Sequence, residues 1–398
     1  MQIGYLIPEF PGQTHIWMWR EICHMREWGM SIHLFSTKRP SPATKARHGF
    51  AKAEDETYYL WKPSYLEIIK AILWAIFTRP LGLIKSIWLA LTIDVDDRDH
   101  SYLIALVLIA CIFAREAKKR GIEHLHCHSC GNCAILAIML KRLTGIPYSL
   151  TLNANLEWWG GGLTSKFADA DFTIVITKWL LEEVRYKYPL RPEQLILGGI
   201  GVDTTKWTPQ HDNELKNPNN SFQIVTVSRL HPSKGHDTLI RATKQLIDAG
   251  KPVKLNIIGA GSELDNLKAL VNQLNLSEFI DFTGSLSEDQ IIEIMQQADA
   301  FVLASHAEPL GVVYMEAMAM EVPTIGTNAG GVGEIITNNH DGLLVPPRDD
   351  TMIANALTLL IENPLLRLQL GRNGRETIIQ RFDSRIGAAT LFHRLKKG

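Results

Sequence analysis

Short apolar runs alternate with amphipathic, helix-length segments along this 398-residue chain, which predicts parallel sheets covered by helices. In the first half, apolar runs predict strands at Ile3 to Ile7, Ser31 to Ser36, His124 to Cys127, Tyr148 to Leu152 and Phe172 to Ile176. A predicted helix, Thr14 to Trp28, separates the first two strands. Because strands joined through helices pair in parallel, the first half is expected to form an α/β domain.

The second half shows the same alternation more regularly. Its strands are predicted at Ile224 to Val227, Leu255 to Ile258, Ile280 to Phe282, Phe301 to Leu303 and Thr324 to Gly326. A polar, Asn- and Pro-rich segment, Pro209 to Ser221, predicts a linker between the halves. The chain length suits two domains of about 150–200 residues each.

Composition narrows the class of protein. The residues are 46% hydrophobic and 21% charged, which is typical of a globular protein, and a formal net charge of −1 gives no basic field for nucleic acid. The five cysteines form no secretory disulfide framework. Since the opening MQIGYLIPEF has neither the basic start nor the apolar length of a signal peptide, we expect a cytoplasmic protein.

Two apolar regions of the first half leave a membrane contact open. Tyr65 to Thr92 is interrupted by charges, and Tyr102 to Ala114 is short, so neither reaches the roughly 20 apolar residues of a membrane span. They are either core helices or surface helices that touch the inner face of the plasma membrane, where the basic run Arg115 to Arg120 would help. All ten tryptophans lie between Trp17 and Trp207, so we expect the first half to meet lipid or saccharide.

Two carboxylates in EPLGVVYME are the strongest candidates for chemistry. Glu308 closes the apolar run Ala300 to Ala304, and Glu316 lies on the helix predicted over Val312 to Met320. The amides of Leu310 to Val313, at the start of that helix, lack intrahelical partners. A strand end, a glycine and a helix N-terminus in this order predict a site for an anionic or hydroxyl-rich ligand.

Arg229 and Lys234, in VSRLHPSKG, follow the first predicted strand of the second half. A planar guanidinium and a point-like ammonium in one loop can clamp two phosphates, although two solvated surface cations would have the same sequence. Gly259-Ala260-Gly261 follows the second strand. Because Leu264 stands where a dinucleotide motif has its third glycine, a tight turn is the better interpretation. Ala329 to Glu334 predicts another glycine turn, either a plain turn or a close backbone approach to a ligand.

A cysteine group in the first half resembles a metal site. Cys127, Cys130 and Cys133, beside His126, have ligand types for zinc or an iron–sulfur cluster. No second Cys-x2-Cys pair accompanies them, and small cysteines also suit the start of a buried helix at Cys133 to Arg142. We expect no bound metal.

Three segments of the second half resemble the retaining glycosyltransferases of family 4: Asp299 to Pro346, Val227 to Ala242 and Gly198 to Pro209. The opening YLIPEFPGQTHIWMWREICHMREWG is similar to bacterial exopolysaccharide (colanic-acid-type) members. The resemblance implies two Rossmann-like domains with parallel sheets facing a cleft. The acceptor domain would be residues 1–205, the donor domain 206–382, and 383–398 a helix packing back on the first domain.

The resemblance also implies an activity, which is metal-independent transfer of a hexose with retention. The favoured donor is a UDP-hexose such as UDP-glucose, with GDP-mannose as the alternative, and the acceptor is a polysaccharide or a lipid-linked oligosaccharide. The implied catalytic residues are Arg229, Lys234 and Glu308. The implied donor-binding residues are Gly12, Asn153, Gly259, Leu286, Leu310, Gly311, Val312 and Glu316, with Leu286 near the base and Glu316 on the ribose.

Asn153 departs from the family pattern, which has a histidine at this strand end. Asparagine can donate a hydrogen bond to a sugar but cannot act as a general base. The departure puts a histidine-assisted step in doubt, and it leaves three alternatives open. They are a nucleotide-sugar epimerase on the same fold, a non-catalytic nucleotide-sugar-binding scaffold, and a cytosolic enzyme similar to glycogen synthase.

Overall fold

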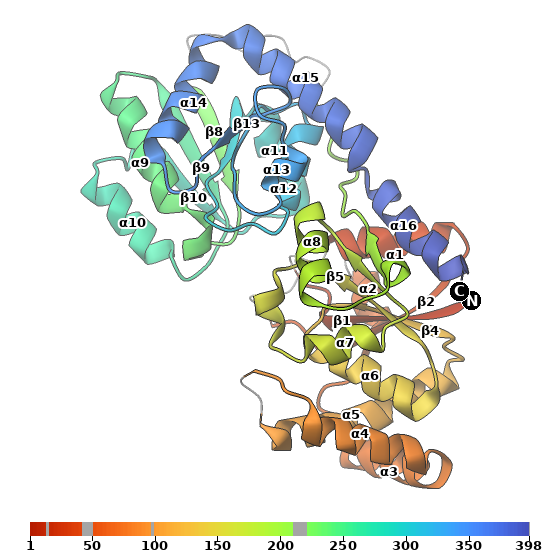
Figure 1. Ribbon diagram of the computed structural model, residues 1–398. Coiled ribbons are helices and arrows are strands. Elements are labelled where there is room, and N and C mark those ends of the chain that lie inside the picture. The colour runs from red at the N-terminus through yellow and green to blue at the C-terminus, as the bar shows by residue number, and fades with distance from the viewer. Residues whose placement is uncertain (13–15, 42–50, 97–98, 210–220, 398) are drawn as a thin grey trace. The chain divides into compact units, whose positions relative to one another are not determined.

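The computed structural model describes residues 1–12, 16–41, 51–96, 99–209 and 221–397. The chain forms two compact units (Figure 1): unit 1 comprises Met1–Gly199 with Ala388–Gly398, and unit 2 comprises Ile200–Gly387. The predicted linker falls almost entirely outside the described residues.

Unit 1 is built on a parallel seven-stranded sheet in the order β3-β2-β1-β4-β5-β6-β7. The strands are β1 (Gln2–Glu9), β2 (Ser31–Lys38), β3 (Tyr58–Tyr59), β4 (His124–His128), β5 (Tyr148–Leu152), β6 (Phe172–Val175) and β7 (Leu195–Leu197). All five predicted strands of the first half are present. The very short β3 and β7 were not predicted.

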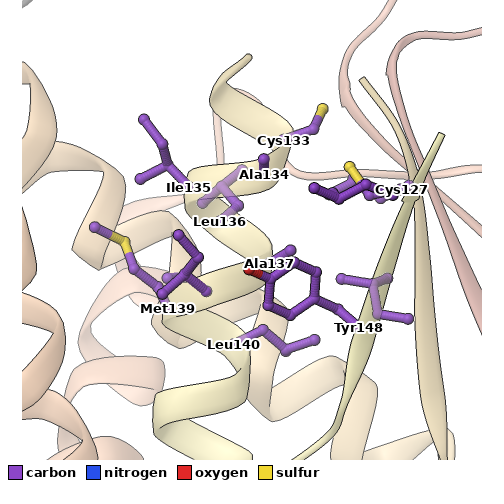
Figure 2. Packing of buried hydrophobic residues seen from close by; sticks show 14 of the residues in the cluster. Cys127, Cys133, Ala134, Ile135, Leu136, Ala137, Met139, Leu140 and Tyr148 are labelled. Atoms are coloured by element: carbon purple, nitrogen blue, oxygen red, sulfur yellow. The ribbon is translucent and has the colours of Figure 1, made fainter. Parts of the chain in front are cut away.

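Eight α-helices cover the described part of unit 1. They are α1 (Ile16–Glu27), α2 (Ala51–Glu56), α3 (Tyr65–Thr78), α4 (Pro80–Thr92), α5 (His100–Lys119), α6 (Asn132–Thr144), α7 (Leu163–Ala168) and α8 (Lys178–Lys187). Helix α6 is buried along most of its length and packs against Cys127 and Tyr148 of the sheet (Figure 2). Pro80 starts α4 because proline cannot continue the hydrogen bonding of α3, so the predicted apolar segment forms two helices.

Unit 2 contains a parallel six-stranded sheet in the order β10-β9-β8-β11-β12-β13. Its strands are β8 (Phe222–Val227), β9 (Val253–Ile258), β10 (Ile280–Gly284), β11 (Ala300–Leu303), β12 (Thr324–Thr327) and β13 (Leu343–Val345). The order reverses between β8 and β11. In open α/β sheets, ligands bind at the carboxyl ends of the strands at such a reversal.

The helices of unit 2 run between these strands and after them. They are α9 (His236–Asp248), α10 (Leu264–Gln273), α11 (Glu288–Gln297), α12 (Val312–Ala319), α13 (Val332–Ile335), α14 (Asp350–Glu362), α15 (Pro364–Arg381) and α16 (Ser384–Lys397). The last turns of α16 belong to unit 1. There Phe392 meets Trp28 with ring centroids 5.1 Å apart, and Arg394 donates to the carbonyl of Glu193 at 3.0 Å. The predicted return of the final helix to the first domain is confirmed.

Candidate donor site in unit 2

Two loops meet at the point where the strand order of unit 2 reverses. One follows β8 and the other follows β11, and the amide of His306 in the second donates to the carbonyl of Ser233 in the first at 2.7 Å. Gly235 has a φ of +64°, and a Cβ there would lie 1.9 Å from the carbonyl oxygen of Ala304. Glycine therefore allows the two loops to touch through their backbones.

An ion pair joins the same loops through their side chains. The Nζ of Lys234 lies 2.6 Å from Oε2 of Glu308, and the side chains are only 15% and 9% exposed. Ser305 donates its Oγ proton to the same carboxylate oxygen at 3.2 Å. Arg229 is exposed in the β8 loop. The residues predicted to act on the phosphates and on the sugar thus lie at one strand-end edge.

The position of Glu308 differs from the prediction. Strand β11 ends at Leu303, so Glu308 lies five residues beyond it, in the loop, and does not close the strand. Gly331 holds this loop by donating its amide to the carbonyl of Glu308 at 3.0 Å. A Cβ on Gly330, whose φ is +61°, would lie 2.2 Å from the same oxygen. The glycine turn predicted at Ala329 to Glu334 therefore packs against Glu308.

Helix α12 begins at Val312 after Gly311, whose φ of +92° favours glycine. No side chain caps this helix start. Leu310 is buried just before it, and Tyr314 anchors the helix by donating its hydroxyl to the carbonyl of Leu303 at 2.8 Å. Glu316 is half-buried on the next turn. The helix start thus offers backbone amides beside the Lys234–Glu308 pair.

The turns after β9 and β10 extend this edge. Gly259 donates its amide to the carbonyl of Gly284 at 2.9 Å, and Leu230 donates to that of Ala260 at 3.0 Å. A Cβ on Gly259, whose φ is +147°, would lie 1.8 Å from the carbonyl oxygen of Ser228. The tight-turn interpretation of Gly259 accounts for these contacts. Leu286 is half-buried just after β10.

His236, which the sequence analysis missed, supports the β8 loop. It is buried at the start of α9, and its Nε2 lies 3.0 Å from Oγ of Ser228. Burial, followed by the positive charge of Lys234, lowers the pKa of His236 to about 4. The imidazole is therefore neutral at ordinary pH and acts as a hydrogen-bonding support. Its place one residue after the Lys234-Gly235 pair was the only sequence signal.

Gly12 and Asn153 belong to unit 1, whereas the other predicted site residues belong to unit 2. Gly12 is buried at the end of the described β1 loop, and the rest of that predicted loop lies outside the described residues. Asn153 follows β5 directly and is half-buried. The structure therefore places Asn153 at the strand end where the family pattern has a histidine.

The cysteine group lies in the core of unit 1. Cys127, Cys130 and Cys133 are buried, and burial raises the pKa of the Cys130 thiol to about 12. Such thiols stay protonated and pack like small apolar side chains.

Another group of side chains in unit 1 has ligand geometry. Glu21, His126 and His128 place their ligand atoms within 4.8 Å of one another. Nε2 of His128 lies 2.9 Å from Oε1 of Glu21, and Tyr5 hydrogen-bonds to both side chains. His126 is already held by the hydroxyls of Ser149 and Thr151 at 2.9 and 3.1 Å. The group is a buried hydrogen-bond network, which sequence spacing could not reveal.

Residues 208–377 match the family model of glycosyl transferases group 1. Unit 2 is therefore a group 1 glycosyltransferase domain. A lipopolysaccharide core biosynthesis glycosyltransferase (LpsD) of Rhizobium meliloti is 33% identical over 172 residues, which are 43% of this chain and 48% of the relative. A colanic acid biosynthesis glycosyltransferase (WcaL) of Escherichia coli, described as putative in its name, is 29% identical over 171 residues, 42% and 41% of the two chains. The match to a glycogen synthase of Mycobacterium tuberculosis is 25% identical and covers 62% of each chain. The chain thus spans about two fifths to three fifths of the length of these curated relatives.

Solved structures extend the likeness of fold to the whole chain. Anabaena HepE in complex with UDP and glucose superposes with a TM-score of 0.76 at 17% identity and covers all of both chains. A sucrose-phosphate synthase of Thermosynechococcus elongatus gives 0.75 at 19% identity, over 100% of this chain and 98% of the other. The predicted two-domain fold, of the GT-B type, is confirmed.

Proposed function

We propose that the chain is a retaining hexosyltransferase that uses a nucleotide-sugar donor and a saccharide or lipid-linked saccharide acceptor. The observation that carries the proposal is the Lys234–Glu308 pair, 2.6 Å apart where the strand order of a group 1 domain reverses. Cations beside unpartnered helix amides suit a diphosphate, and a carboxylate suits sugar hydroxyls.

The reaction follows from these roles. The bond between the sugar C1 and the diphosphate breaks, and the acceptor oxygen bonds to C1 on the same face. The acceptor proton passes to the departing phosphate oxygen. Arg229 and Lys234 stabilise the negative charge that develops on the leaving diphosphate, which is the largest contribution to the rate in sites of this kind. Glu308 orients the donor sugar, and Glu316 holds the ribose.

No metal takes part in this mechanism, because two cations occupy the place where a metal would neutralise the diphosphate. The expectation rests on Arg229 and Lys234 alone. Asp-x-Asp triplets, which could hold a metal, occur in unit 1, among them Asp94 to Asp96.

The donor base is the least constrained part of the proposal. HepE is solved with UDP-glucose, but the identity of 17% relates only the folds. A Mycobacterium tuberculosis mannosyltransferase named for its GDP-mannose dependence is 32% identical over 162 residues, 39% of this chain and 42% of the relative. A UDP-hexose remains the favoured donor and GDP-mannose the alternative. A glycogen-synthase-like enzyme with a soluble acceptor is the second candidate, because that relative matches the longest stretch.

A thermal-shift panel with UDP, GDP and ADP tests the donor site first. One nucleotide should raise the melting temperature, since a ligand that binds only the folded state stabilises it. Arg229→Gln and Lys234→Gln should each weaken that nucleotide by about tenfold or more, because a hydrogen bond to a charged group contributes about 1.5–3 kcal/mol. Lys254→Gln, an exposed change on β9, is the matched control. Equal affinities in all variants would refute the clamp.

The transfer itself needs a separate measurement. Incubation with the stabilising nucleotide's sugar and a panel of saccharide and lipid-linked acceptors should release nucleoside diphosphate and yield a product whose anomeric configuration matches the donor. An inverted product would refute the front-face mechanism. A donor converted to an isomer without any acceptor would identify the epimerase alternative. Donor binding without turnover on any acceptor would favour the scaffold.

A further inference from the structure

Helices α3 and α4 of unit 1 carry large apolar side chains on their outer surface. The most exposed are Tyr65, Leu66, Phe77, Leu81, Ile84 and Trp88, at 59% to 89% exposure. We call these six residues the α3–α4 face. The two helices lie side by side beyond α5 and α6 in unit 1 (Figure 1). Apolar exposure on this scale marks an interaction surface in an otherwise globular protein.

The inner sides of these helices are made mainly of small residues. The buried residues are Ala71 and Ala75 in α3, and Gly82, Ser86, Leu89 and Ala90 in α4. A Cβ on Gly82 would lie 2.5 Å from the carbonyl oxygen of Arg142, so α4 sits directly on the backbone of α6. Helices in water bury their large apolar residues and expose polar ones. Here small residues face the protein and large apolar ones face outward, which is the arrangement of helices in lipid.

The charges around the face indicate the sign of its partner. Between Trp61 and Thr92 the exposed charged residues are basic at Lys62, Lys70, Arg79 and Lys85 and acidic only at Glu67. Glu67 also serves as the third residue of the capping box that begins at Ser64. The segment is therefore positive in a chain whose net charge is −1. Basic side chains beside an exposed apolar helix favour an anionic bilayer surface.

The lengths of the helices fix the mode of contact. Helices α3 and α4 have 14 and 13 residues. At about 1.5 Å per residue, each is about 20 Å long, shorter than the roughly 30 Å hydrocarbon core. Among the described residues, only α5 is long and apolar enough to cross a membrane, and 50% of its apolar window is buried inside the structure. Contact along the surface fits these dimensions better than a span.

We propose that the α3–α4 face docks unit 1 onto an anionic lipid bilayer, with its large apolar side chains in the interface and Lys70, Arg79 and Lys85 at the headgroups. A protein partner would need hydrogen-bonding groups among its contacts, at about one per 100–200 Å² of interface. The most exposed side chains of the face supply only the hydroxyl of Tyr65 and the indole nitrogen of Trp88. The proposal is independent of the proposed function, because docking is measured without any transfer.

The basic run once expected to aid the contact, Arg115 to Arg120, is partly committed elsewhere. Arg120 pairs with Glu116 at 2.7 Å and lies over the rings of Phe35 and Tyr58 at 5.4 and 5.3 Å. Neutralising Arg120 would therefore disturb unit 1 itself. Lys70, Arg79 and Lys85 are the better choice for a test of charge.

Co-sedimentation of the full chain with vesicles tests the apolar part. Wild-type protein should pellet with mixed phosphatidylcholine–phosphatidylglycerol vesicles at low salt. The variant Phe77→Ser/Leu81→Ser/Trp88→Ser should partition at least about tenfold less, since burying a large apolar side chain contributes roughly 1.5–3 kcal/mol, a tenfold factor or more.

A matched control changes three apolar residues exposed elsewhere. Leu359, Leu365 and Ile379 are 41%, 78% and 44% exposed in unit 2, and their triple change to serine should leave partition unaltered. Circular dichroism checks that both variants fold. An equal loss in the control variant would overturn the proposal.

Charge is tested in the same assay. Lys70→Gln/Arg79→Gln/Lys85→Gln should lower the affinity for anionic vesicles by roughly a hundredfold, because each basic side chain near such a surface contributes about 1 kcal/mol. The binding that remains should lose most of its salt dependence. The exposed residues Arg241, Lys254 and Lys268 of unit 2 supply the matched control triple.

Two outcomes would refute the docking proposal. One is wild-type protein that stays in the supernatant at low salt with anionic lipid in excess. The other is a dimer that the apolar triple variant disrupts, with no vesicle binding, because it would identify a second copy of the chain as the occupant of the face.

Discussion

Removing one partner of the Lys234–Glu308 pair should destabilise unit 2 more than removing both. The pair is 2.6 Å long, and its side chains are 15% and 9% exposed. In Lys234→Met the carboxylate of Glu308 keeps the Ser305 hydroxyl, at 3.2 Å, but loses its only printed cationic partner. In Glu308→Gln the ammonium of Lys234 loses its counter-charge. The double variant leaves neither charge unpaired.

The expected size follows from burial. Losing a hydrogen bond between charged groups costs about 1.5–3 kcal/mol, and breaking a completely buried pair from one side costs about 3–5 kcal/mol. Since both side chains retain some exposure, we expect about 2–3 kcal/mol for each single change. In a unit of this size, 1 kcal/mol corresponds to about 2–4 °C in Tm, so each single variant should melt roughly 4–12 °C lower. The double variant should lose less than the sum by about 1 kcal/mol or more.

Calorimetry is the appropriate assay because it resolves the melting of each unit. Every tryptophan except Trp207 lies in unit 1, so fluorescence would report mainly the unit without the pair. The change Lys254→Gln on β9 controls for loss of a lysine at an exposed position. Strict additivity of the two single changes, or a loss below about 0.5 kcal/mol in each, would refute the reasoning, because directly paired charges must couple.

Three further predictions concern the same unit. Glu316→Gln should weaken the free nucleotide, whereas Glu308→Gln should leave its affinity nearly unchanged and reduce turnover; equal losses of affinity would contradict the division of roles. Transfer should survive EDTA, and purified protein should hold no stoichiometric zinc or iron; a metal lost on Glu21→Gln would show the opposite. The folded pKa of His236, about 4, lies below the 6.5 of the free side chain, so the unfolded chain takes up a proton first and stability falls as pH drops from about 6.5 to about 4. His236→Asn should flatten the pH dependence of the unit 2 melting temperature in that window, and an unchanged slope would count against it.

The strands could be predicted because buried parallel strands are nearly continuous apolar runs. Each predicted strand is present, with its ends within two residues of the observed ones. The strands β3, β7 and β13 were missed. They have two, three and three residues, too few for an apolar run to stand out. Their order in the sheet also depends on contacts between distant segments, which the pattern along the chain does not encode.

The candidate site was predicted as residues but not as an arrangement. Lys234 and Glu308 were assigned to different parts of a donor, yet they form one ion pair across 74 residues of sequence. Ser305 and His236 were missed because a serine in a loop and a histidine at a helix start have no distinctive spacing. Their roles appear only when the loops after β8 and β11 meet. The Asn153 departure was visible at once, since it is a change of residue type at a strand end.

The direction of the α3–α4 face could not be predicted from the sequence, and the physical reason is specific. Sequence periodicity locates the core side of a helix when one side is apolar and the other is polar. Both sides of α4 are apolar or small, so the pattern names no core side. The packing decides it, because Gly82 and Ser86 allow α4 to lie close to α6, which leaves Leu81, Ile84 and Trp88 outside. The two apolar regions that the sequence left open together therefore separate in the structure: α5 contributes to the core, and α3 with α4 forms the outer face.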